Sequence, residues 1–76
     1  MQIQLFGVLK EKLETGTIIL EFSGNLQGLK NLLQEKYPQL HHQRYSVAVN
    51  QKVVFNPEQF LSETDVVALL PPFSGG

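Results

Sequence analysis

The sequence has no cysteine and no tryptophan, and its only two histidines, His41 and His42, are adjacent. Without cysteine there is no disulfide framework, no thiolate metal site and no cysteine nucleophile. Adjacent histidines point in different directions and lack the spacing at which two side chains hold one ion, so no metal site is expected. The seven carboxylates are scattered among polar neighbours, and no pair is set out for acid–base catalysis. We therefore expect no enzyme active site within the chain itself.

An excess of charge of one sign and long apolar runs are also missing. The formal net charge is -1, which provides no basic surface for the phosphates of a nucleic acid. No apolar run approaches the ~18 residues of a membrane span. The opening MQIQLFGVLKEK lacks the cationic start and apolar core of a signal peptide. We expect a cytoplasmic protein that binds neither nucleic acid nor membrane.

What the chain does have is 42% hydrophobic residues in a length of 76, the composition of one small folded domain. Apolar and polar residues alternate in QIQLF, which predicts a strand over residues 2–7. The β-branched TIILEF predicts a second strand. Between them VLKEKLE is expected to form a short helical turn, so the two strands would pair as a hairpin with a long connection.

In SGNLQGLKNLLQEKYPQL the apolar residues recur at the spacing of a helix instead of that of a strand, which predicts the main helix. Asn25 can cap its start, and Pro38 ends it because the residue before a proline is pushed out of the helical region. One side of this helix carries the large apolar side chains that we expect in the core: Leu26, Leu29, Leu32, Leu33 and Tyr37.

The second half of the chain returns to strand patterns. YSVAVN and KVVF predict a hairpin joined by a tight turn at Asn50 and Gln51. NPEQFLSETD is expected to be a loop with a helical turn beginning at Pro57. VVALL is apolar on both faces, which is typical of a central strand. This order predicts an α+β ubiquitin-like β-grasp, a mixed sheet of four to five strands with one main helix across it and the last strand beside the first.

The ending PPFSGG suggests a probe that reaches into another protein. Pro71 and Pro72 cannot continue a sheet and form a stiff spacer, and six extended residues reach ~20 Å. Gly75 and Gly76 carry no side chain and can pass through a narrow channel. We therefore expect residues 1–70 to form the domain and residues 71–76 an extended tail. A frayed end, a truncated sequence or a cloning scar is the plainer interpretation of the two glycines.

The group that such a tail presents is the α-carboxylate of Gly76. A carboxylate is a poor electrophile, so it reacts only after it gains a better leaving group. Adenylation by an ATP-using partner would supply one, and sulfur could then displace AMP to leave a terminal thiocarboxylate. A chain that carries sulfur in this way needs no cysteine of its own.

The segments IQLFGVLKEKL, AVNQKVV and TDVVALLPPFSGG resemble the small, sulfur-carrier subunit of molybdopterin synthase, in the ubiquitin-like sulfur-carrier superfamily. The double proline before the terminal Gly-Gly is the most specific part of this resemblance. The resemblance implies that a ubiquitin-activating-type enzyme adenylates Gly76, which becomes a thiocarboxylate. It also implies that the tail enters the large synthase subunit and gives sulfur to cyclic pyranopterin monophosphate, building the dithiolene of molybdopterin. The chain would then be a non-catalytic subunit that binds no cofactor, while the activating partner uses ATP.

The family also docks through an apolar patch on its sheet, and the sequence offers candidates for one. Phe6 follows Gln2 and Gln4 on a face where alternation predicts polar residues, Leu70 lies on the face opposite Leu69, and Val53 opens the short strand. Phe73 is expected to anchor the tail. Lys10 and Arg44 match basic positions of the family pattern, although a solvated role accounts for them equally well. The remaining partner-binding residues that we expect lie in the tail: Pro71, Pro72 and Ser74.

Three other functions are compatible with the same residues. The chain could carry sulfur for another pathway, such as thiamine, cysteine or tRNA thiolation. It could be a ubiquitin-like modifier, in which the activated Gly76 joins lysines of target proteins. It could also be a β-grasp interaction module that uses no covalent chemistry.

Overall fold

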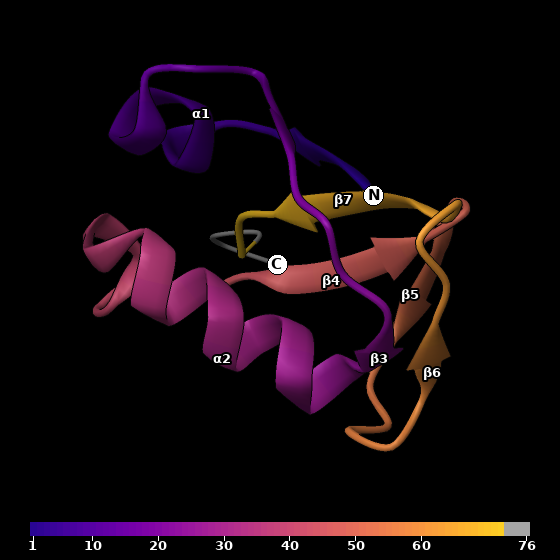
Figure 1. The fold of residues 1–76 in the computed structure, drawn as a ribbon. Coiled ribbons are helices and arrows are strands. Elements are labelled where there is room, and N and C mark those ends of the chain that lie inside the picture. Colours follow the sequence, from indigo (N-terminus) through magenta and orange to yellow (C-terminus); the bar gives the residue numbers. More distant parts are fainter. Residues whose placement is uncertain (73–76) are drawn as a thin grey trace.

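The fold is a mixed five-stranded sheet with one main helix across one face, as a computed structural model that describes residues 1–72 shows (Figure 1). The strands follow the order β2-β1-β7-β4-β5. β7 runs parallel to β1 and antiparallel to β4, so the last strand occupies the middle of the sheet beside the first. The bounds of the sheet strands are β1 (Gln2–Leu5), β2 (Thr17–Ile19), β4 (Ser46–Val49), β5 (Lys52–Val54) and β7 (Val66–Leu70).

The main helix, α2 (Leu26–Lys36), begins and ends as its sequence predicts. The backbone N–H of Gly28 donates to Oδ1 of Asn25 at 2.8 Å, which caps the first turn. Pro38 lies beyond the last helical residue and opens a short 3-10 helix, η1 (Pro38–Leu40). Leu26, Leu29 and Leu33 are buried, while Leu32 and Tyr37 are partly buried against the same core.

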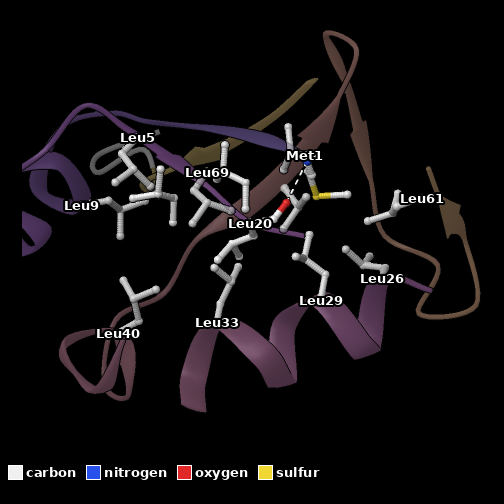
Figure 2. Packing of buried hydrophobic residues seen from close by; sticks show 14 residues of the cluster. Met1, Leu5, Leu9, Leu20, Leu26, Leu29, Leu33, Leu40, Leu61 and Leu69 are labelled. Carbon is white, nitrogen blue, oxygen red and sulfur yellow. Dashed lines mark hydrogen bonds between the residues drawn. The ribbon is translucent and has the colours of Figure 1, made fainter. Parts of the chain in front are cut away.

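The core lies between α2 and the sheet (Figure 2). Leu29 and Leu33 point from the helix toward Leu5 of β1 and Leu69 of β7. Burial of aliphatic side chains is the main stabilising contribution in a domain of this size. The sheet residues that face this core are Ile3, Leu5, Ile18, Val47, Val67 and Leu69.

The N-terminal residue closes one end of this core. The α-ammonium group of Met1 donates to the carbonyl oxygen of Leu20 at 2.7 Å (Figure 2). It also lies 3.1 Å from Oε1 of Glu63. The other oxygen of Glu63, Oε2, accepts from the backbone N–H of Phe22 at 2.9 Å. These bonds tie the start of β1 to the chain that follows β2 and to the loop before β7.

The second half differs from the sequence prediction in one element. Residues 57–59 form the single turn expected at Pro57, in which the N–H of Gln59 donates to the carbonyl of Asn56 at 3.0 Å. The segment that we expected to be a loop contains β6 (Phe60–Leu61), which pairs with β3 (Gly24–Asn25) in a separate small sheet. A two-residue strand shows no alternation, so its pairing depends on a partner far away in the chain.

The short helix expected before residue 15 is α1 (Val8–Leu13), whose Leu9 is buried in the core. Residues 73–76 lie outside the described part of the chain, and so do the expectations for Phe73, Ser74, Gly75 and Gly76. Within the described residues, no helix is both long enough and apolar enough to cross a membrane.

Candidate functional site

The side of the sheet that faces away from α2 is the candidate docking surface, and we call it the outer sheet face. Strand registers define it, because Gln4 of β1 lies opposite Ala68 of β7, and Ala68 lies opposite Ala48 of β4. Ala48 in turn lies opposite Val53 of β5. By the same alternation, continued one residue past β1 and β5, the larger apolar members of the outer sheet face are Phe6, Ile19, Val53, Phe55, Val66 and Leu70.

These apolar side chains reach solvent to different extents. Phe6 is 45% exposed and Val53 46% exposed, and Leu70 is half-buried. The sequence singled out these three residues, and the structure places them on one face. Isolated apolar residues on a surface are ordinary, but a group of them on one face is typical of a contact surface.

Sequence reasoning missed three members of this surface, Ile19, Phe55 and Val66, which are 70%, 80% and 42% exposed. Strand alternation could have found them, because successive side chains of a strand point to opposite faces and their neighbours include the buried Ile18 and Val67. VVALL is central, as predicted, but only its Val67 and Leu69 side is buried. No helix covers the outer sheet face among the described residues, so β7 is buried on one face and reaches solvent on the other.

The two basic candidates lie in different places. Lys10 lines a shallow hollow together with Phe6, Gly7 and Thr17, at the edge of the outer sheet face. Arg44 instead lines a groove beside α2 with Lys30 and Gln34. The structure therefore brings Lys10, but not Arg44, next to the apolar docking candidates.

One tyrosine and one carboxyl group have altered proton affinities. Burial raises the pKa of Tyr45, which lines the same groove as Arg44, and a hydrogen bond with Gln34 partly offsets this effect. Asp65 lies in the loop before β7. A hydrogen bond from the backbone N–H of Ser62, and then one from the side chain of Asn50, hold the pKa of Asp65 below its usual value. Neither residue belongs to the outer sheet face.

The tail begins at the same end of the sheet as Phe6. β7 ends at Leu70, which lies opposite Ser46 of β4. Pro71 follows and packs against Gly7, the residue directly after Phe6. Pro71 is half-buried and Pro72 is exposed. The start of the tail and the docking surface are therefore neighbours.

A metal centre has no support in this part of the chain. Within residues 1–72 no three histidine, aspartate or glutamate side chains gather where they could hold an ion. The ring of His41 is hydrogen-bonded within the domain, because its Nε2 lies 2.9 Å from the carbonyl oxygen of Gln34, near the end of α2.

The sheet order, the parallel pairing of first and last strands and the single crossing helix define a ubiquitin-like β-grasp protein. Solved structures with this fold superpose over nearly the whole chain. Small archaeal modifier protein 1 (SAMP1) from Haloferax volcanii has a TM-score of 0.83 at 22% identity, over 100% of this chain and 98% of that one. SAMP1 from Methanosarcina acetivorans has a TM-score of 0.75 at 23% identity, over 99% and 94%.

Residues 3–76 match the ThiS family, and the chain belongs to that family. It is a ThiS-type sulfur carrier by fold and family. It is also similar to a chain in the protein–protein complex of subunits 1 and 2 of molybdopterin-converting factor from Helicobacter pylori 26695. That similarity has a TM-score of 0.75 at 28% identity, over 99% of this chain and 96% of the other. The resemblance to the ubiquitin-like sulfur carriers that the sequence indicated is confirmed at the level of the family and the fold.

Proposed function

We propose that this protein carries sulfur for molybdopterin synthesis as the small, non-catalytic subunit of molybdopterin synthase, in the cytoplasm. The main observation in its favour is that the tail begins beside the outer sheet face. The central strand β7 ends between the half-buried Leu70 and Pro71, next to Phe6 of an uncovered apolar face. A partner that covers this face would receive residues 71–76 directly. The similarity to a molybdopterin-converting factor chain that is bound to its second subunit supports the same arrangement.

The proposed chemistry has two steps at Gly76. An activating enzyme transfers the AMP group of ATP to the terminal carboxylate, which releases pyrophosphate and forms an acyl adenylate. Hydrosulfide then attacks the acyl carbon, the bond to AMP breaks, and a thiocarboxylate remains. The large subunit then binds the tail, and the thiocarboxylate sulfur bonds to a carbon of cyclic pyranopterin monophosphate as an oxygen leaving group departs. Water then hydrolyses the thioester, so that sulfur stays on the pterin and Gly76 regains its carboxylate.

In this proposal each predicted residue has a physical role. Phe6, Val53 and Leu70 supply apolar contact area for docking, and Lys10 supplies a positive charge at its edge. Pro71 and Pro72 stiffen the spacer, and Phe73 anchors it in the partner. Ser74 and Gly75 continue the tail to Gly76. Arg44, which lies beside α2, would act only on a partner that extends to the helix side.

The first test is the intact mass of the protein after incubation with a ubiquitin-activating-type enzyme, ATP and sulfide. We expect a mass increase equal to the replacement of one oxygen by sulfur, located at Gly76 by fragmentation. The matched control is the same chain with one alanine added after Gly76, which should keep its mass because the reacting carboxylate is no longer on a glycine at the tail end. An unchanged mass with several competent activating enzymes would contradict the proposal.

The second candidate is a ubiquitin-like modifier, which the similarity to small archaeal modifier proteins favours. The acceptor distinguishes the two functions. A carrier makes molybdopterin from cyclic pyranopterin monophosphate when the thiocarboxylated chain is mixed with the large subunit. A modifier instead forms amide bonds between Gly76 and lysines, and it would give conjugates of higher mass with no dithiolene product.

A further inference from the structure

Gly7, the residue directly before α1, has a backbone conformation that other residues rarely adopt. Its φ is 59° and its ψ is -133°. The Cβ of an L-residue disfavours this region, whereas glycine enters it freely. The same residue starts the helix, because its carbonyl oxygen accepts from the N–H groups of Lys10 and Glu11 at 3.1 Å and 3.3 Å. The conformation of Gly7 therefore turns the chain out of the sheet and into α1.

The space next to Gly7 is filled by the first residue of the tail. A Cβ at position 7 would lie 2.9 Å from Cγ of Pro71, closer than real Cβ contacts allow, and 3.7 Å from its Cβ. Most side chains could rotate away from such a contact. The ring of proline is bonded to its own backbone nitrogen, so the ring of Pro71 moves only if the backbone of the tail moves with it.

The strand register explains why these two residues meet. β1 and β7 are parallel, and Leu5 and Leu69 form their last pair. Gly7 and Pro71 each lie two residues beyond that pair, so the chains leave the sheet side by side. On the other edge of β7, Leu70 is still held opposite Ser46. The direction in which the tail departs is thus fixed on one side by β4 and on the other by Gly7.

We propose that Gly7 is a positioning residue for the tail: its missing side chain lets Pro71 pack against the β1–α1 junction and so directs residues 71–76 relative to the outer sheet face. This inference rests on the proposed function, since it assumes that a partner holds that face while it reacts with Gly76. Gly7 does not touch the reacting atoms. Its effect is on how often a docked chain presents its terminal carboxylate in the partner's active site.

The first test measures the contact itself in the free protein. We expect a nuclear Overhauser effect between the Hα protons of Gly7 and the Hγ protons of Pro71 in solution. This measurement is independent of any activity. Absence of the effect in the folded protein would overturn the positioning role.

The second test measures steady-state adenylation of Gly76 by the activating enzyme, with pyrophosphate release as the readout. Gly7→Ala is expected to lower kcat by about tenfold with KM unchanged, because small displacements of a reacting group are costly while the docking surface stays intact. Gly16→Ala is the matched control, since an added Cβ there meets only Lys10, with 3.4 Å to its Cε. This control should keep kcat, the parameter that the positioning role predicts to fall in Gly7→Ala.

A third comparison avoids strain at position 7, in case Gly7→Ala folds poorly. Pro71→Ala removes the ring atoms that face Gly7, and Pro72→Ala softens the spacer equally without touching Gly7. We expect the larger fall in kcat for Pro71→Ala. A double-mutant cycle on kcat should also show that Gly7→Ala costs less once Pro71 is alanine, whereas backbone strain at residue 7 alone would make the two effects additive.

The outcomes separate the two proposals. If the wild-type chain is not adenylated, the proposed function fails and the positioning role with it. If the wild type is adenylated and Gly7→Ala keeps its kcat, or raises KM alone, only the positioning role is overturned. Circular dichroism melting of each variant shows whether its folded fraction accounts for the change in rate.

Discussion

At the scale of single residues, Asp65 connects three parts of the chain. Its Oδ2 accepts from the N–H of Ser62 at 2.8 Å, and its Oδ1 accepts from the side-chain amide of Asn50 at 3.0 Å. The other side-chain atom of Asn50, Oδ1, accepts from the N–H of Val66 at 3.1 Å. The turn between β4 and β5 is thereby joined to the start of β7, and the two hydrogen bonds that Asp65 accepts are strongest when its carboxyl group is ionised.

The stability of the fold should therefore fall in acid partly through Asp65. Its pKa is lowered in the folded state, from a usual value of 3.8. The stabilisation is fully present above the pKa of the unfolded chain, and it is lost as the pH falls through the lower folded pKa. Urea unfolding at pH 7 and at acid pH should show a smaller loss of unfolding free energy in Asp65→Asn than in the wild type.

Glu58→Gln is the control for this experiment, because Glu58 is an exposed carboxylate in the turn before β6. It should show the same acid sensitivity as the wild type. Equal pH dependence of Asp65→Asn and the wild type would show that the hydrogen bonds to Asp65 do not contribute to acid sensitivity.

At the scale of elements, the turn between β4 and β5 has a backbone conformation that fits the twist of its strands but is unfavourable for one of its residues, Gln51. Asn50 and Gln51 both have positive φ, 49° and 72°. Two-residue hairpin turns of this kind match the twist of the strands and favour Asn-Gly. Asparagine tolerates the left-handed region, whereas a longer side chain such as that of Gln51 adopts it at a cost.

Gln51→Gly should therefore stabilise the protein by about 0.5 kcal/mol, because the gain at positive φ exceeds the extra entropy of glycine in the unfolded chain. Chemical denaturation followed by circular dichroism measures this difference. Gln59→Gly is the control, since Gln59 does not have a positive φ, and it should be neutral or destabilising. A loss of stability in Gln51→Gly would mean that its side chain makes a contact worth more than the strain.

These elements also show which parts of the fold the sequence predicts. The helix α2 and the β4–β5 hairpin depend on local signals: a cap at Asn25, a proline after the last turn and alternating valines. β6 depends on pairing with β3, which lies far earlier in the chain. The outer sheet face was predicted in part, through Phe6, Val53 and Leu70. The contact of Gly7 with Pro71 could not be predicted, because it needs the parallel register of β1 and β7.

At the scale of the whole molecule, the apolar residues of the outer sheet face differ from other exposed aromatics in their position. Phe6 lies at the end of the sheet from which the tail departs, next to Gly7. Phe60 is 66% exposed but belongs to β6, in the separate small sheet. The two phenylalanines are thus both exposed, and they differ in their place relative to the proposed partner.

Phe6→Ser should weaken binding to the large subunit of molybdopterin synthase by about tenfold or more, because aromatic side chains in a contact surface often dominate its binding energy. Phe60→Ser should leave the affinity unchanged. Isothermal titration calorimetry of both variants measures the difference. Equal affinities would place the docking surface elsewhere on the molecule.

The central position of β7 also determines how the molecule bears a mechanical load. A partner that draws on the tail pulls along the axis of a strand that is paired on both edges, with β1 over Val66–Leu69 and with β4 over Val67–Leu70. The force then acts in shear, and the hydrogen bonds on both edges share it instead of breaking one after another. A strand at the edge of the sheet, such as β5, would peel away from one end. A pull on the tail therefore meets more resistance from a central β7 than it would from an edge strand.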